Sequence, residues 1–271
     1  MNPIITASLT GPAATKKDTP AMPGSPEEIA EAAKGAYEAG AAVLHIHLRE
    51  NDNFTADLEI AKRTVALVRE KCKGIVQLST GGGFAYEDRM KIVEAKPAMA
   101  TLNPASMTMG DHEFLNPPKQ MLKLAERMLE LGVKPEVEIY DTGHVNLMLD
   151  LLKRGLLTEP LQVSFVMGTK GGMSADPMLL AYCVRELPPN TSWQVIAISK
   201  ANLPLTTIGL AMGGNARVGL EDTIYVRPKE LATSNAQLVE QLVGVAKSMN
   251  LQPATVDEVV ERLKLSPELV R

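Results

Sequence analysis

Several features that mark secreted, membrane-bound or nucleic-acid-binding proteins are missing from the sequence. The only two cysteines, Cys72 and Cys183, lie far apart and are not spaced like metal ligands, so we expect both to be small buried side chains. No cluster of basic residues is longer than Lys16 and Lys17, and the net charge is −4. We therefore expect no binding site for nucleic acid or for an anionic membrane surface.

Long apolar runs and a targeting segment are missing as well. No stretch approaches the roughly 18 apolar residues that a membrane-spanning helix needs. The first residues, MNPIITASLTG, lack the basic and apolar regions of a secretory signal peptide. From both absences we expect a cytoplasmic protein.

What the sequence does contain is an alternation of short apolar runs with longer amphipathic ones. At 271 residues, 45% hydrophobic and 22% charged, the chain has the length and composition of one α/β barrel. The amphipathic runs predict helices, the first with Ser25 as N-cap, Pro26 at the first helical position and Glu28 completing a capping box. The apolar runs predict strands at residues 3–9, 41–48, 74–79, 98–103, 136–141, 161–167, 192–199 and 215–220.

Eight strand–helix units in strict alternation, with strands too apolar to be half-exposed, predict a parallel sheet covered by helices. Eight is the number of strands that closes a TIM barrel. A doubly wound open sheet is the competing topology, but TGPAAT follows the first strand where that fold has a glycine fingerprint. We therefore predict an α/β fold, a single (β/α)8 TIM-barrel domain over residues 1–271 with a short C-terminal helical extension, TVDEVVERLKL.

Two of the four histidines, His45 and His47, end the second predicted strand. Because side chains alternate along a strand, both imidazoles point to one face of it. In a barrel wall that face is the interior, near the C-terminal mouth where TIM-barrel enzymes keep their sites. Two imidazoles there predict binding of a metal such as zinc, the alternative being two hydrogen-bonded core histidines.

A third ligand is expected from the end of the eighth strand, RVGLED. Glu221 and Asp222 follow buried residues, and carboxylates in such a place are destabilising unless they are paired or metal-bound. One of them can bind the metal while the other acts as a base or orients a water, with Arg217 countering their charge. The alternative is an acidic pair on a solvated surface turn.

Polar side chains recur at the ends of other predicted strands. Taken singly, each is ordinary turn chemistry. Because the C-terminal ends of barrel strands meet at one mouth, together they predict a metal, a carboxylate-binding nest and an acid/base group. They are Ser79 and Thr80 before three glycines, then Thr101, Asn103 and Ser106, then Glu136, Glu138, Asp141 and His144, and finally Lys170.

With these residues in order, the chain resembles the β-keto acid cleavage enzymes. The resemblance covers nearly the whole chain and rests on TASLTG at 6–11, HIHLRE at 45–50, QLSTGGG at 77–83, PEVEIYDTGH at 135–144 and RVGLEDTIYV at 217–226. It implies a zinc-dependent TIM-barrel acyltransferase, usually a homotetramer. It also implies that a β-keto acid and acetyl-CoA react to give acetoacetate and a new acyl-CoA. No phosphate motif indicates where acetyl-CoA binds.

The resemblance also implies roles for particular residues. It makes His45, His47 and Glu221 the zinc ligands. It gives contacts with the substrate carboxylate to Ser79 and Gly82, and to a hydroxyl that is either Thr101 or Ser106. Acid/base chemistry and the orientation of water fall to Glu138, Arg217 and Asp222.

One departure from the family bears on the substrate. Members that act on amino substrates carry an acidic residue in the first βα loop, where this chain has Ala13 and Ala14. A neutral or anionic β-keto acid is therefore expected rather than one with an ammonium group.

Two other functions compete with this interpretation. A metal hydrolase of the amidohydrolase type has its HxH on the first strand and needs histidines after strands five and six, whereas QVSFVMGTKGG has none. A non-catalytic metabolite-binding barrel is disfavoured because so many ionisable groups converge on one mouth, where burying them without function lowers stability.

Overall fold

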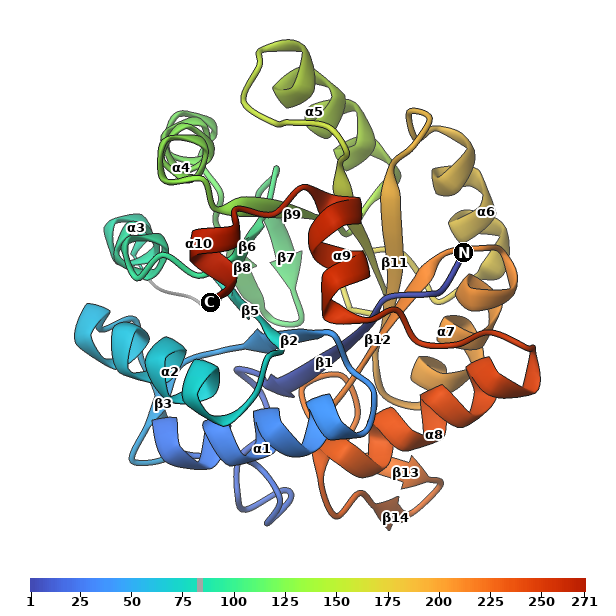
Figure 1. Cartoon of the computed structure of the whole chain (residues 1–271). Coiled ribbons are helices and arrows are strands. Elements are labelled where there is room, and N and C mark those ends of the chain that lie inside the picture. The colour runs from blue at the N-terminus through green and yellow to red at the C-terminus, as the bar shows by residue number, and fades with distance from the viewer. Residues whose placement is uncertain (82–84) are drawn as a thin grey trace.

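The computed structural model describes residues 1–81 and 85–271, and its centre is a closed barrel of eight parallel strands (Figure 1). Each strand pairs with its neighbours along the chain, and the last pairs with the first. The predicted TIM barrel is therefore confirmed. The barrel strands are β1 Ile5–Thr10, β2 Val43–Ile46, β5 Ile75–Leu78, β6 Met99–Leu102, β9 Lys134–Ile139, β10 Gln162–Met167, β11 Ser192–Ala197 and β12 Asn215–Val218.

Helices cover the outside of the barrel (Figure 1). Between strands and helices lie two large apolar clusters, which bury the outward faces of the strands. A short 3-10 helix, η1 Ser199–Ala201, directly precedes the helix over residues 202–211. The covering helices are α1 Pro26–Glu38, α2 Leu58–Lys71, α3 Tyr86–Glu94, α4 Pro118–Leu131, α5 Thr142–Lys153, α6 Pro177–Arg185, α7 Asn202–Ala211 and α8 Asn235–Ser248. Within the described parts of the chain, none of the helices is long and apolar enough to cross a membrane.

Two local predictions need correction. Ser25 caps α1 as predicted, its hydroxyl accepting from Glu28 N at 3.3 Å. The capping box is wrong, however, because the Glu28 carboxylate accepts from Gly24 N at 2.6 Å. The second correction concerns the cysteines: Cys183 is buried in α6, but Cys72 is only half-buried and ends α2.

The last two helices, α9 Val256–Leu263 and α10 Pro267–Val270, lie across the end of the barrel where the strands begin (Figure 1). Ala254 N, just before α9, donates to Pro3 O at 2.9 Å, and Asn2 donates to Glu258 at 3.0 Å. Val259 and Leu263 are fully buried in the larger apolar cluster. This end of the barrel is therefore covered, and the opposite, C-terminal mouth is the end with a candidate site.

Three hairpins that were not predicted follow the carboxyl ends of barrel strands. They are too short to show strand periodicity, and their polar residues resemble loops in the sequence. Hairpins placed on a rigid barrel are a common location for binding residues. They are β3 Arg49–Glu50 with β4 Asn53–Phe54 after the second barrel strand, β7 Met107–Met109 with β8 His112–Phe114 after the fourth, and β13 Tyr225–Arg227 with β14 Glu230–Leu231 after the eighth.

Below the mouth, the barrel interior contains a group of polar side chains that we call the glutamine cluster. The Glu136 carboxylate, fully buried, accepts at Oε2 from the amides of Gln77 (2.9 Å), Gln194 (3.0 Å) and Gln162 (3.4 Å). A buried carboxylate needs such partners because burial removes its hydration. The cluster is relevant to the site because Gln77 also contacts His45.

Candidate metal centre and reaction cavity

Three side chains capable of binding a metal meet at the C-terminal mouth, and we call them the His–His–Glu cluster. His45 lies in β2, His47 directly follows that strand, and Glu221 follows β12. His45 Nε2 lies 3.1 Å from Glu221 Oε2, and His47 Nε2 lies 3.2 Å from Glu221 Oε1. The candidate ligand atoms of all three residues lie within 4.8 Å of one another.

Strand β1 brings these distant parts of the chain together, because it pairs with β2 on one side and β12 on the other. The Thr10 hydroxyl accepts from His47 N at 3.0 Å and donates to His47 O at 2.7 Å, which fixes the backbone beyond β2. On the other side, a Cβ at Gly219 would lie 2.1 Å from Ser8 O, so only glycine lets this loop approach β1. The close approach positions Glu221 opposite the histidines.

The hydrogen bonds of His45 determine which ring nitrogen faces Glu221. Its Nδ1 lies 2.7 Å from Gln77 Oε1, and since the Gln77 amide nitrogen donates to Glu136, Oε1 must accept a proton from Nδ1. His45 Nε2 then presents a lone pair to Glu221 Oε2. Both atoms are buried and make no hydrogen bond within the described residues. Two such acceptors 3.1 Å apart repel each other unless a cation or proton lies between them, so this donor set fits a divalent metal such as zinc.

A buried arginine stands behind the cluster. Arg217 Nε and Nη2 donate to the two oxygens of Asp222 at 2.9 and 2.7 Å, and Nη2 lies 3.0 Å from Glu221 Oε1. Asp222 also accepts from the Ser8 hydroxyl at 2.7 Å. Burial alone would raise the pKa of Glu221, but the charge of Arg217, together with the imidazoles, holds this pKa well below its usual range. Glu221 is therefore ionised and able to bind a metal.

Glu138 reaches the mouth from β9 and is the remaining acid/base candidate. Its Oε2 accepts from Asn103 Nδ2 at 2.9 Å and from the Tyr140 hydroxyl at 3.3 Å, while Oε1 lies 3.9 Å from Arg217 Nη1. Burial raises the pKa of Glu138 to about 7, against the opposing effect of Arg217. A carboxyl group with such a pKa can take up and release a proton near neutral pH.

A cavity of about 490 Å³ opens above these groups, and we call it the reaction cavity. Its size is within the range of small-molecule sites. Met109, Phe114 and Tyr140 give it an apolar wall, while His112 and Glu113 reach it from the β7–β8 hairpin. His112 and Glu113 were not predicted as site residues from the sequence, because only the hairpin brings them over the barrel. His47 and Glu221 of the His–His–Glu cluster line the cavity, and so do Glu138 and Ser79.

Of the residues predicted to contact the substrate carboxylate, only some line the reaction cavity. Ser79 lines the reaction cavity, and its hydroxyl accepts from Gly81 N at 3.2 Å. Thr101 and Ser106 are not among the lining residues: Thr101 Oγ1 accepts from Thr80 N at 2.9 Å, and Ser106 Oγ accepts from Asn116 N at 2.7 Å. Gly82 lies outside the described residues.

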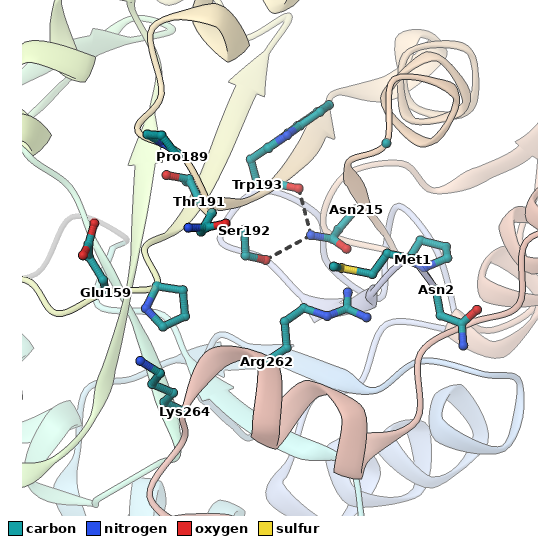
Figure 2. Close-up of a pocket in the computed structure, with 14 residues that line it drawn as sticks. Met1, Asn2, Glu159, Pro189, Thr191, Ser192, Trp193, Asn215, Arg262 and Lys264 are labelled. Carbon is teal, nitrogen blue, oxygen red and sulfur yellow. Dashed lines mark hydrogen bonds between the residues drawn. The ribbon is translucent and has the colours of Figure 1, made fainter.

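Another cavity, of about 480 Å³, lies at the opposite end of the barrel beside the first residues of β11 and β12 (Figure 2). Arg262, Lys264 and Trp193 line it, and Asn215 donates there to Ser192 Oγ at 3.1 Å and Trp193 O at 2.9 Å. It includes no member of the His–His–Glu cluster. The reaction cavity is therefore the place where a bound metal and a substrate can meet.

The arrangement differs from that expected of an amidohydrolase. The HxH pair lies at the end of β2, the second barrel strand, rather than on β1. Residues 168–176, which connect β10 to α6, contain no histidine. The ligand set of that class is therefore incomplete in this barrel.

Comparison with known sequences points to one family. Residues 3–265 match the sequence model of the beta-keto acid cleavage enzymes. The chain is 37% identical to the 3-keto-5-aminohexanoate cleavage enzyme of Acetoanaerobium sticklandii, over 97% of this chain and 98% of that protein. It is 32% identical to the 3-oxoadipate:acetyl-CoA acetyltransferase of Cupriavidus necator, over 93% of this chain and 91% of that protein.

Solved structures agree on the fold. The apo structure of ObcA superposes with a TM-score of 0.78 at 20% identity, over 91% of this chain and 66% of the ObcA chain. Methylornithine synthase superposes with a TM-score of 0.60 at 14% identity, over 97% of this chain and 86% of that chain. At these identities the likeness concerns the fold alone.

Proposed function

Because the chain belongs to the β-keto acid cleavage enzyme family, we propose that it converts a β-keto acid and acetyl-CoA into acetoacetate and a new acyl-CoA. The observation that carries this proposal is the His–His–Glu cluster at the mouth of the barrel, backed by Arg217 and Asp222 and opening on the reaction cavity. Three protein ligands that leave a further position open are typical of a catalytic zinc site.

We propose zinc as the resident metal, held by His45, His47 and Glu221. The unpaired lone pair of His45 Nε2 and the ionised Glu221 carboxylate support a divalent ion with nitrogen and oxygen ligands. When bound, zinc would supply Lewis acidity toward a ketone oxygen in the reaction cavity.

The proposed reaction begins at C2 of the β-keto acid. Loss of a proton from C2 of the β-keto acid allows C2 to attack the acetyl carbonyl carbon, and the CoA thiolate leaves. The thiolate then attacks the original ketone carbon, C3. The C2–C3 bond breaks, so that C3 leaves as the new acyl-CoA and C2 is part of acetoacetate, which regains the proton.

We assign the proton transfer to Glu138. It lines the reaction cavity, has a pKa of about 7 and is oriented by Asn103 and Tyr140. Asp222 suits a different role from the base expected from the sequence, since Arg217 and Ser8 already occupy both of its oxygens. It holds the Arg217 guanidinium next to Glu221 and Glu138, where its positive charge offsets negative charge that develops in the cavity.

We assign the binding of the substrate carboxylate to Ser79 and the neighbouring backbone. Ser79 lines the cavity, its hydroxyl can donate to an anion, and Gly81 beside it also lines the wall. The contacts implied for Gly82 and for Thr101 or Ser106 stay predictions. The homotetramer, the single-domain organisation and the cytoplasmic location also stay predictions. The molar mass of the purified protein, measured by light scattering, tests whether it is a homotetramer.

A direct assay tests the proposed function. Zinc-loaded protein is incubated with acetyl-CoA and a panel of β-keto acids, and acetoacetate and the new acyl-CoA are measured. Glu221→Gln should abolish both zinc binding and turnover, whereas Glu126→Gln, on the exposed face of α4, should leave both unchanged. Absence of acetoacetate from every β-keto acid, with stoichiometric zinc bound, would refute the proposal.

A further inference from the structure

A second cavity near the mouth, of about 530 Å³, adjoins the loop that carries Glu221 and Asp222, since Thr223 lines it. Segments that follow the seventh and eighth barrel strands form it: Ser199 and Lys200 after β11, and Thr223 with the β13–β14 hairpin after β12. Figure 1 shows this hairpin beside α8. In TIM-barrel enzymes the loops after strands seven and eight frequently bind a phosphate group.

The charge of this cavity is opposite to that of the reaction cavity. Three cations, Lys200, Arg227 and Lys229, line it without any carboxylate among the described lining residues, and we call it the cationic cavity. The reaction cavity is lined by three carboxylates and two histidines. The positive cavity is notable in a chain whose net charge is −4, because nothing in the overall composition requires it.

The cations are available to a ligand. Within the part of the chain that the structure describes, Lys200 and Lys229 take part in no ion pair or side-chain hydrogen bond. Arg227 Nη1 lies 3.9 Å from Glu230, and both side chains are exposed. Water and salt screen such a surface pair, so it competes weakly with a multiply charged phosphate.

A buried acceptor without a partner gives an independent indication of a ligand. Asn202 lines the cationic cavity and is 1% exposed. Its Nδ2 donates to Ala197 O at 2.8 Å and to Arg217 O at 3.3 Å, but Oδ1 has no hydrogen-bond partner within the described residues. A buried carbonyl oxygen left in this state is destabilising, and an N–H or O–H group of a ligand in the cavity would satisfy it.

The remaining wall suits a flat ring. Leu203, Val226 and Leu238 line the cationic cavity together with Tyr225, a residue that is 45% exposed. An aromatic ring with an open face offers stacking to a heteroaromatic base. The cationic cavity thus has an apolar wall, a partly exposed tyrosine, a buried acceptor and three cations. This combination matches a nucleotide that carries several phosphates.

The two cavities adjoin the same loop. Thr223 lines the cationic cavity, Glu221 lines the reaction cavity, and Asp222 lies between them. Ser199 N donates to Asp222 O at 2.7 Å, and exposed Ser199 has a left-handed φ of 58°. A non-glycine residue in this conformation is strained, and such strain clusters at ligand sites. The two cavities therefore lie against the same short segment, residues 221–223, with Ser199 held to its middle residue.

We propose that the cationic cavity binds the adenosine 3′-phosphate 5′-diphosphate end of acetyl-CoA, with the thioester arm passing over Ser199 to the reaction cavity. This inference rests on the proposed function, because it assumes that acetyl-CoA is a substrate. Lys200, Arg227 and Lys229 contact the phosphates, Tyr225 stacks on the adenine and Asn202 Oδ1 accepts from the ligand.

Charge reversal of two exposed lysines tests this site. Lys200→Glu and Lys229→Glu should each weaken the binding of CoA and of adenosine 3′,5′-bisphosphate about tenfold or more, measured by calorimetry on the zinc-loaded protein. Lys123→Glu, an equal change of charge on the exposed face of α4, is the matched control and should bind as the wild type does. In turnover, the lysine variants should raise KM for acetyl-CoA and leave KM for the β-keto acid and for acetylpantetheine unchanged.

The outcomes separate this site from the proposed function. Wild-type protein that forms acetoacetate, with folded lysine variants that bind CoA as tightly as the wild type, would overturn the site alone. Protein that binds CoA through these lysines but forms no acetoacetate would overturn the proposed function alone. Inorganic phosphate that competes as well as the bisphosphate would reduce the cavity to an unspecific anion site and refute the nucleotide assignment.

Discussion

Replacing Gln77 with leucine should lower zinc affinity without touching any proposed ligand. Gln77 Oε1 is the acceptor that keeps the proton of His45 on Nδ1, and its amide nitrogen donates to Glu136. Without Gln77 the ring can rotate, and its proton can move to Nε2, the nitrogen that faces Glu221. The His45 lone pair would then no longer be held toward the metal.

Loss of an outer partner of a metal-binding histidine costs about 10- to 100-fold in metal affinity, or about 1.4–2.8 kcal/mol. Glu136 would also lose one of its three amide donors, which should lower the free energy of unfolding by about 1–3 kcal/mol. Gln194→Leu is the matched control, because Gln194 also donates to Glu136, at 3.0 Å, and within the described residues it makes no hydrogen bond with His45.

Zinc affinity of each metal-free protein can be measured by titration against a chelating dye, and stability by urea unfolding. The wild type should bind one zinc ion and gain about 2.7 kcal/mol of stability when free zinc is 100 times its dissociation constant. Gln77→Leu should lose both affinity and stability, whereas Gln194→Leu should lose stability alone. If Gln77→Leu bound zinc like the wild type, or if Gln194→Leu lost as much affinity, the role assigned to Gln77 would be wrong.

Substitutions at Asp222, Lys134 and Gly219 test other parts of the structure. Asp222→Asn leaves the buried Arg217 charge with a weaker partner, so it should lower the free energy of unfolding by about 3 kcal/mol, measured with urea, and lower kcat; unchanged kcat would contradict the positioning role. Burial lowers the pKa of Lys134 from 10.5 to about 8, so the folded state carries a buried charge below pH 8 and stability rises as the pH increases from 8 to 10.5. Lys134→Met should therefore be more stable than the wild type by about 2 kcal/mol at pH 7, with the difference shrinking by pH 10; a constant difference across unfolding curves at pH 7, 9 and 10 would refute this. Gly219→Ala should displace the loop that carries Glu221, because the new Cβ would lie 2.1 Å from Ser8 O; it is expected to reduce zinc binding in the dye titration, and normal binding would show that the loop adjusts freely.

The barrel and the direction of the two histidines were predictable from the sequence because they depend on local periodicity. Apolar runs separated by amphipathic ones predict strands and helices, and a spacing of two residues in a strand places His45 and His47 on one face. Residues at the ends of barrel strands meet at one mouth whatever their distance along the chain, which is why a third ligand could be expected from Glu221 or Asp222 at the other end of the sequence. The family resemblance then indicated Glu221.

Other parts of the site depended on contacts that the sequence does not encode locally. Thr101 and Ser106 were equivalent candidates as hydroxyls, and only the tertiary structure shows that backbone amides of Thr80 and Asn116 already use both oxygens. His112 and Glu113 reach the reaction cavity only because a short hairpin folds over the mouth.

Residue type and spacing were sufficient to predict the fold, the family resemblance and the candidates for the His–His–Glu cluster. Only the tertiary structure established how these candidates are used. It paired Asp222 with Arg217 and Ser8, oriented His45 through Gln77, and gathered three cations from two separate loops into one cavity. The physical reason is that hydrogen bonding and charge act over a few ångströms in space, and the closure of the barrel sets those distances between residues that are far apart in the chain.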